Sequence, residues 1–258
     1  MSTVAQPIPA ASRGGRRPTL RPKGRVMTTV AQPVPATASG MPEPQQASSL
    51  RGSIVRLALL VVPPLTLAAV LLLHPPGGDN VYEGVRHDVG SWLLVHVGML
   101  LALPLLGIGA YLLLDGLRGR AVLVSRVALV FFLVFYTAYE ATVGVATGVL
   151  ADYANGLAAP EQAAVADAIQ DLNRNAILAD PSLALVLGSL GWIVAMVAAA
   201  VALRRAGASW VITVLVGLSA AFAVHPPPVG PVALLCFVAA AVLLERSRSH
   251  VPARGGAA

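Results

Sequence analysis

The chain alternates long apolar runs with short polar connections. Each run is near the ~20 residues that an α-helix needs to cross the ~30 Å hydrocarbon core of a membrane. The runs cover residues 54–73, 91–114, 121–150, 182–203, 206–224 and 230–244. This pattern predicts an all-α fold, a polytopic membrane protein whose six-helix transmembrane bundle occupies residues 53–246.

The segments outside these runs differ in character. Residues 1–52 are rich in Pro, Ser, Gln, Ala and Arg without an apolar period, which predicts a disordered basic tail, and residues 247–258 are expected to form a second disordered tail. Between the third and fourth runs, residues 160–175 predict a short surface helix. Pro160 suits its first turn, and Val165, Ile169 and Leu172 form an apolar stripe.

The N-terminal tail contains a repeat. The segment "MSTVAQPIPA" at residues 1–10 returns as "MTTVAQPVPA" at residues 27–36. Either the repeat is a duplicated partner-binding motif, or it reflects a small tandem duplication or a start at Met27 in place of Met1. The second interpretation is the simpler one.

Composition supports the membrane assignment. Hydrophobic residues make up 56% of the chain and charged residues 12%, with a mean hydropathy of +0.74. These values lie well outside the range of soluble globular domains, so the lipid bilayer is the expected partner. A homo-oligomer or a membrane partner is compatible with the sequence, which carries no signal for either.

The net charge of +6 encodes topology and does not indicate nucleic acid. Of the 18 basic residues, 16 lie in the tails, in alternate connections or, as Arg56 and Arg126 do, just inside the adjoining runs, and only Arg86 and Arg174 lie on the other side. By the positive-inside rule, both termini are cytoplasmic. The opposite side is acidic, with residues such as Asp88, Asp152 and Asp167.

Residue usage suggests the source and the compartment. Lys23 is the only lysine, and Ala, Val, Leu, Gly and Pro dominate, as in proteins from GC-rich bacterial genomes. A bacterial origin would place the protein in the cell membrane. Cys236 is the only cysteine, so the chain cannot form an internal disulfide.

Four ionisable residues near the outer side form the candidate site. His96 and Glu140 lie within apolar runs, where an ionisable group costs about 2.5 kcal/mol or more and usually faces the bundle interior. His74 and His225 each precede prolines, in "LHPPGG" (73–78) and "VHPPPVGP" (224–231), and these corners are also explained as helix ends. Counted by helical rise from the charged residues at the inner ends of the runs, all four are expected ~20 to 30 Å above the inner boundary of the membrane, where they could share one layer.

Two further patterns bear on this layer. Tyr136, Glu140, Gly144 and Gly148 are spaced four apart, and small residues on that ridge predict that it faces another helix. The sixth run, residues 230–244, spans only ~23 Å, so its outer turn is expected to dip into the membrane and draw His225 toward His96.

Several functions are compatible with these residues. His96, Glu140, His225 and His74 could ligate a transition metal, or two of the histidines could ligate haem, for a binding, sensing or redox role. The alternatives are a small transporter or proton-coupled permease that uses Glu140, and a structural or assembly protein in which a His96–Glu140 hydrogen bond only locks helices together. No nucleotide-binding, serine-hydrolase or CxxC motif occurs in the chain, so the sequence gives little reason to expect an enzyme.

Overall fold

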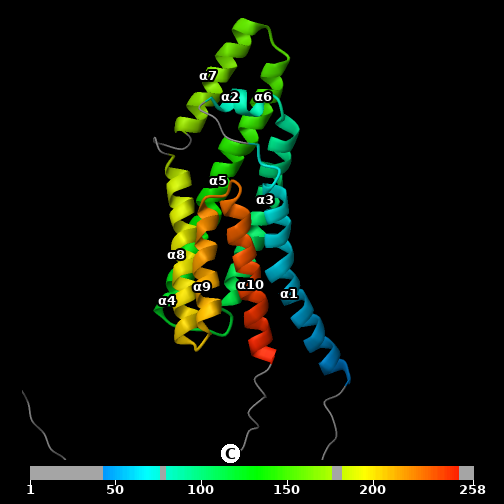
Figure 1. Cartoon of the computed structure of the whole chain (residues 1–258), viewed down its shortest axis with the longest axis vertical. Coiled ribbons are helices and arrows are strands. Elements are labelled where there is room, and N and C mark those ends of the chain that lie inside the picture. The colour runs from blue at the N-terminus through cyan, green and yellow to red at the C-terminus, as the bar shows by residue number, and fades with distance from the viewer. Residues whose placement is uncertain (1–42, 76–79, 176–181, 250–258) are drawn as a thin grey trace, which may run out of the picture. The chain divides into compact units, whose positions relative to one another are not determined.

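The computed structural model describes residues 43–75, 80–175 and 182–249, and within these ranges every element is a helix (Figure 1). In chain order the elements are α1 (Glu43–Leu71), α2 (Val81–Val85), α3 (Val89–Leu113), α4 (Arg120–Phe131), η1 (Phe132–Tyr136), α5 (Thr137–Tyr139), η2 (Glu140–Val145), α6 (Ala146–Asn155), α7 (Ala159–Asn175), α8 (Leu183–Arg205), α9 (Trp210–Leu218), η3 (Ser219–Ala223) and α10 (Val229–Ser249).

The chain is a multi-pass membrane protein. Among the described residues, 5 helices are long and apolar enough to cross a membrane: Gly52–Leu71, Val89–Leu113, Arg120–Asn155, Leu183–Arg205 and Val229–Arg248. Large apolar side chains such as Leu101 and Val62 are exposed on the outer faces of these helices, where lipid is their natural solvent.

The fifth apolar run is shorter than the sequence predicts. It forms the 9-residue α9 and the 5-residue 3₁₀ helix η3, which together rise about 24 Å. This length falls short of the ~30 Å hydrocarbon core. The structure therefore supports five full-length spans, and the sixth expected crossing is this short Trp210–Ala223 segment.

The prediction that the last helix is short is wrong. α10 has 21 residues and continues through its charged end to Ser249. Arg248 stabilises this end, because its guanidinium lies 2.8 Å from Glu245 one turn earlier and donates a 3.0 Å hydrogen bond to the carbonyl of Leu113. The segment that ends early is therefore the fifth one, whose last helical residue, Ala223, lies two residues before His225.

The start of the first helix, α1, also differs from the prediction. α1 begins at Glu43, so residues 43–52, assigned to the disordered tail, are helical. These residues include Glu, Gln and Ala, and a helix already nucleated by an apolar run extends readily into such residues. The repeat at 1–10 and 27–36 and the tail at 250–258 lie outside the described residues.

Close helix packing forms the bundle core. α1 packs against α3 and α10, and α4 and η1 pack against α8. A Cβ added to Gly191 would lie 2.6 Å from the backbone nitrogen of Phe132, so α8 and the third span touch backbone to backbone. Phe132, Trp192 and Phe222 fill the space beside this contact with their rings.

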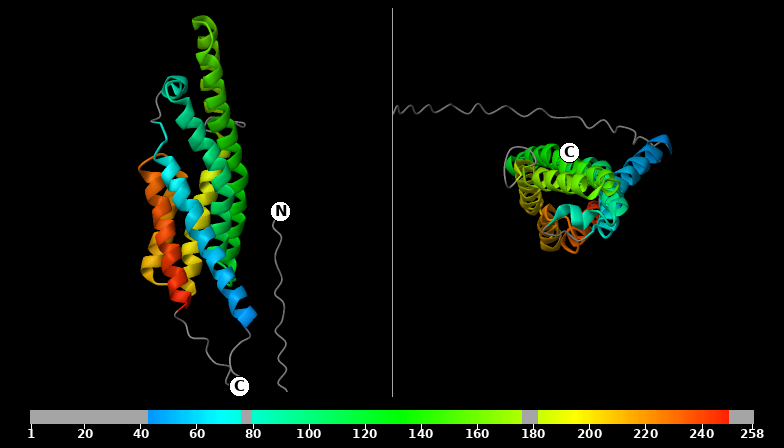
Figure 2. Two further views of the ribbon diagram at one scale, coloured as in Figure 1. Left: turned by 90° about the vertical axis from the view of Figure 1, so that its right-hand side faces the viewer. Right: turned by 90° about the horizontal axis from the view of Figure 1, so that it is seen from above.

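A small cap covers one end of the bundle. It consists of α2, α6 and α7, where α7 is the helix predicted at 160–175, and it stands above the other helices in Figure 2. Its apolar centre contains Tyr82, Val85 and Ile169 packed against Trp92 of α3. Asn173 ties α7 to the third span by donating a 2.9 Å hydrogen bond to Thr147.

The third span is not a uniform α-helix. The π-helical turns η1 and η2 interrupt it at Phe132–Tyr136 and Glu140–Val145, and it runs on as α6 to Asn155. Tyr136, Glu140, Gly144 and Gly148 are all buried, as the ridge in the sequence predicts. Such π turns occur frequently at functional sites, and here Glu140 is the first residue of η2.

Candidate metal centre

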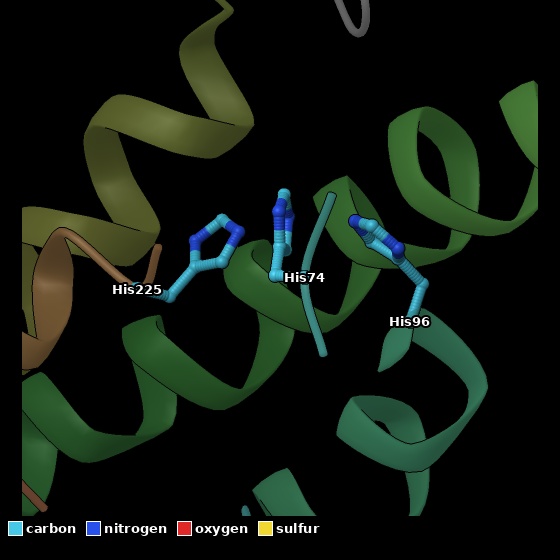
Figure 3. Close-up of side chains that lie close together, drawn as sticks. All are labelled: His74, His96 and His225. Atoms are coloured by element: carbon cyan, nitrogen blue, oxygen red, sulfur yellow. The ribbon is translucent and has the colours of Figure 1, made fainter. Parts of the chain in front are cut away.

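Three histidines from distant parts of the sequence meet below the cap. His74 follows α1, His96 lies on α3 and His225 lies between η3 and α10, and their rings face a common space in Figure 3. One ring nitrogen of each lies within 4.8 Å of the others. The structure thus brings together three of the four residues that the sequence singles out, and the fourth, Glu140, lies beside them.

Backbone carbonyls fix the orientation of two of these rings. Nδ1 of His96 lies 2.8 Å from the carbonyl oxygen of Trp92, and Nδ1 of His74 lies 2.7 Å from that of Pro75. A carbonyl oxygen only accepts hydrogen bonds, so each Nδ1 carries the hydrogen and each Nε2 presents a lone pair. Histidines that bind metal through one ring nitrogen commonly donate the hydrogen of the other nitrogen to a backbone carbonyl in this way.

His225 has a different partner. Its Nδ1 lies 2.7 Å from the hydroxyl oxygen of Tyr136, and the Tyr136 side chain is fully buried. A hydroxyl group can donate or accept, so this contact does not by itself fix which nitrogen of His225 carries the hydrogen.

Glu140 is a buried carboxyl group without a hydrogen bond. Its Oε2 lies 3.8 Å from Nε2 of His96, and its Oε1 lies 4.0 Å from Nδ1 of His225. Both distances are too long for hydrogen bonds, and neither oxygen has another partner among the residues that the structure describes. Buried polar atoms are nearly always satisfied, so these two oxygens indicate a missing partner.

Tight packing holds His96 in this position. A Cβ added to Gly144 would lie 2.1 Å from Cδ2 of His96, so only glycine fits there. The ring of Trp92 stacks on His96 with ring centres 4.2 Å apart, and the Trp92 indole N–H donates a 2.6 Å hydrogen bond to the carbonyl of Gly144. Trp92 therefore links His96, the η2 turn and the apolar centre of the cap.

Burial keeps the two corner histidines neutral. It lowers the pKa of His225 to about 3, with smaller contributions from His74 and His96, and it also lowers the pKa of His74. Neutral imidazole is the form that binds metal ions, so protons compete weakly for these nitrogens.

The remaining histidines do not contribute to the cluster. His87 is exposed in the connection between α2 and α3, as its polar neighbours suggest, and His250 lies outside the described residues. The sequence gives little sign of Trp92, Tyr136 and Gly144 as neighbours of the histidines. Two spacings point to them: Trp92 lies one turn before His96, and Tyr136 and Gly144 each lie one turn from Glu140.

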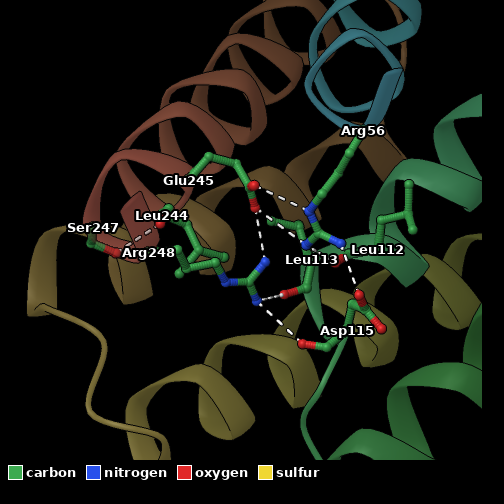
Figure 4. A network of polar contacts seen from close by, with 8 residues as sticks. All are labelled: Arg56, Leu112, Leu113, Asp115, Leu244, Glu245, Ser247 and Arg248. Atoms are coloured by element: carbon green, nitrogen blue, oxygen red, sulfur yellow. Dashed lines mark hydrogen bonds and ion pairs between the residues drawn. The ribbon is translucent and has the colours of Figure 1, made fainter. Parts of the chain in front are cut away.

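A second polar cluster, drawn in Figure 4, lies where α3 and α10 end. The Arg56 guanidinium on α1 contacts Asp115 at 3.0 Å and Glu245 of α10 at 3.1 Å, and donates to the carbonyl of Leu112. Its carboxylates are each paired with arginine, in contrast to Glu140. This cluster ties α1, α3 and α10 together and has the features of a structural contact.

Compared with known proteins, the chain matches no family model, no curated protein and no solved structure. The arguments for function therefore rest on the site itself.

Proposed function

We propose that this membrane protein binds a divalent transition-metal ion through His74, His96, His225 and Glu140. The observation that carries the proposal is the convergence of three histidine nitrogens to within 4.8 Å from three separate segments. Glu140 supports it, because a buried carboxylate with two unpartnered oxygens lies 3.8 Å from the lone-pair nitrogen of His96. A cation at this point would satisfy every one of these groups.

The donor set suits zinc, copper, iron or nickel. Imidazole nitrogen and carboxylate oxygen bind such ions at about 2.0 to 2.2 Å, which puts ligand atoms roughly 3.3 Å apart in a tetrahedral site. The histidine nitrogens, which lie within 4.8 Å of one another, must therefore draw together by up to about 1.5 Å when the ion binds. Three neutral imidazoles and one carboxylate leave a divalent ion with one positive charge, and a buried site of this kind favours further neutralisation by a small anion.

A bare ion fits this site better than haem does. Haem with two histidine ligands needs a flat macrocycle between the two rings. The third histidine occupies that space here, because the ring of His74 lies 5.3 Å from that of His96 and 5.4 Å from that of His225.

Proton-coupled transport is the second candidate. It is favoured by the same Glu140 carboxyl, because an unpaired ionisable group inside a membrane bundle is typical of proton and ion pathways. The purely structural alternative is less well supported, since the His96–Glu140 hydrogen bond on which it depends is replaced by a 3.8 Å separation.

The same proposal includes the setting of the site. The charge distribution supports a topology with both termini in the cytoplasm and the cap outside, and the residue usage supports a bacterial cell membrane. In this orientation the short α9–η3 segment makes the sixth crossing, and its early end brings His225 down to the level of His96. The metal would then be reached from the outer side.

Metal analysis of the purified protein tests the proposal. We expect one equivalent of a transition metal after zinc loading and removal of free ion, and its loss in His96→Gln and His225→Gln variants. His87→Gln is the matched control, because His87 is exposed and lies in a connecting segment. Equal metal content in all of these variants would refute the site. For the transport candidate, proton flux in liposomes that persists in Glu140→Gln would argue against Glu140 as the carrier.

A further inference from the structure

The hydroxyl group of Tyr136 contacts His225 at the edge of the proposed metal site. We infer that Tyr136 is a positioning residue that makes His225 a metal ligand: in the metal-bound protein its hydroxyl oxygen accepts the Nδ1 hydrogen of His225, and its own hydrogen turns to Oε1 of Glu140, which has no hydrogen-bond partner among the described residues. This inference rests on the proposed metal site and assigns no direct contact between Tyr136 and the ion.

The three histidines differ in the hydrogen-bond partner of Nδ1. His74 and His96 are held by backbone carbonyls, at 2.7 and 2.8 Å, that leave Nε2 as the ligand atom in every state. His225 instead contacts the Tyr136 hydroxyl at 2.7 Å. If that hydroxyl donates, Nε2 of His225 carries the hydrogen and cannot bind metal; if it accepts, Nε2 is free to bind.

The hydroxyl hydrogen of Tyr136 also needs a partner. When the Tyr136 oxygen accepts from His225, its O–H needs an acceptor in a buried place. Glu140 follows one turn later on the same span, and its Oε1 lies 4.0 Å from the Nδ1 that Tyr136 contacts. The other oxygen, Oε2, faces Nε2 of His96 at 3.8 Å. One carboxylate can thus accept from Tyr136 through Oε1 and bind the ion through Oε2.

Packing holds Tyr136 rigidly in the bundle. Its side chain has no exposed surface, and its ring lies 5.3 Å from the ring of Phe132 and 6.2 Å from that of Phe222. A Cβ on Gly188 of α8 would lie 2.7 Å from its backbone nitrogen. The hydroxyl cannot turn away, so its contact with His225 is a built feature of the bundle.

Removal of one hydroxyl group tests this role. Tyr136→Phe keeps the ring and the packing, and we expect it to weaken zinc binding by about 10- to 100-fold, the usual effect of losing a second-shell partner. Tyr153→Phe is the matched control, because Tyr153 is a tyrosine whose side chain is exposed on α6. Its zinc affinity should equal that of the wild type.

A double variant separates a role through His225 from a general effect on structure. In a His225→Gln background, Tyr136→Phe should cause no further loss of zinc affinity, because its only route to the metal is already gone. With cobalt as the probe, the visible absorption of Tyr136→Phe should shift toward that of His225→Gln, which a change in stability alone would not produce.

The outcomes distinguish the two proposals. If the wild-type protein binds no zinc or cobalt, the metal site and the role of Tyr136 both fail. If the wild type binds and Tyr136→Phe binds equally well, or its loss adds fully to that of His225→Gln, only the role of Tyr136 is refuted.

Discussion

The carboxylate of Glu140 lies 3.8 Å from Nε2 of His96 and forms no hydrogen bond with it. This separation is the central difference between a structural pair and a ligand site. The nitrogen and oxygen of a pair that locks two helices would lie about 3 Å apart in a hydrogen bond. Two ligand atoms of one metal ion do not bond to each other and stay roughly 3.3 Å or more apart.

Glu140→Gln follows directly from this relationship. The amide has the same shape but no charge, so we expect zinc affinity to fall by at least 10-fold while the thermal stability of the metal-free protein stays equal or rises, because a buried charge without a partner is costly. Zinc competition titrations and thermal unfolding in detergent measure the two effects. A large loss of stability with unchanged affinity would support the structural alternative instead.

Gly144→Ala tests the packing that positions His96. The added methyl group would lie 2.1 Å from Cδ2 of His96, so either the ring or the η2 turn must move. We expect a loss of about 1 to 3 kcal/mol in the free energy of unfolding and a clear loss of zinc affinity.

Gly217→Ala is the control for this experiment. Gly217 lies on α9, and an added Cβ meets nothing within 4 Å. The same substitution there should leave zinc binding unchanged and stabilise the helix by up to about 1 kcal/mol. Equal effects at Gly144 and Gly217 would show that His96 is not held by this contact.

Much of the fold could be predicted from the sequence because lipid imposes a simple rule. Long apolar runs become helices, as with Val89–Leu113, since no other backbone arrangement satisfies itself in the hydrocarbon core. The ends of helices depend on specific contacts, so the last turn of α10, held by Arg248 against the Leu113 carbonyl, could not be foreseen. The same is true of the early end of η3.

The candidate site was only partly predictable for a related reason. The cost of placing His96 and Glu140 in apolar runs marks them as inward-facing from sequence alone. Nothing in a single sequence gives the hydrogen-bond partners of a ring nitrogen, because the carbonyls of Pro75 and Trp92 are present in any chain and become partners only through geometry. The π turns η1 and η2 likewise have no sequence signature.

Acidic pH should destabilise the metal-free protein. The folded state holds the pKa of His225 near 3, below the ordinary value of 6.5 that applies when the chain unfolds. Between these values the unfolded state binds more protons, so stability is full above about pH 6.5 and declines as the pH falls, by at most about 1.4 kcal/mol per pH unit for one group. His74 acts in the same direction.

Unfolding temperatures measured between pH 7.5 and 5 check this expectation. His225→Gln removes the buried imidazole, so its stability should depend less steeply on pH than that of the wild type. Identical slopes for the two proteins would mean that His225 is not buried as a neutral group.

Glu245→Gln should affect the fold without affecting the metal. Glu245 contacts Arg56 at 3.1 Å and Arg248 at 2.8 Å, and so joins α1 to the end of α10. Loss of its charge leaves two arginines without their shared partner, and we expect the free energy of unfolding to fall by about 1 to 3 kcal/mol. The zinc affinity of the folded protein should stay at the wild-type value, because the histidines lie at the other end of the bundle. A matching loss of zinc affinity would instead show that the two ends are coupled, as a transporter with alternating states requires, and would favour the transport candidate over simple metal binding.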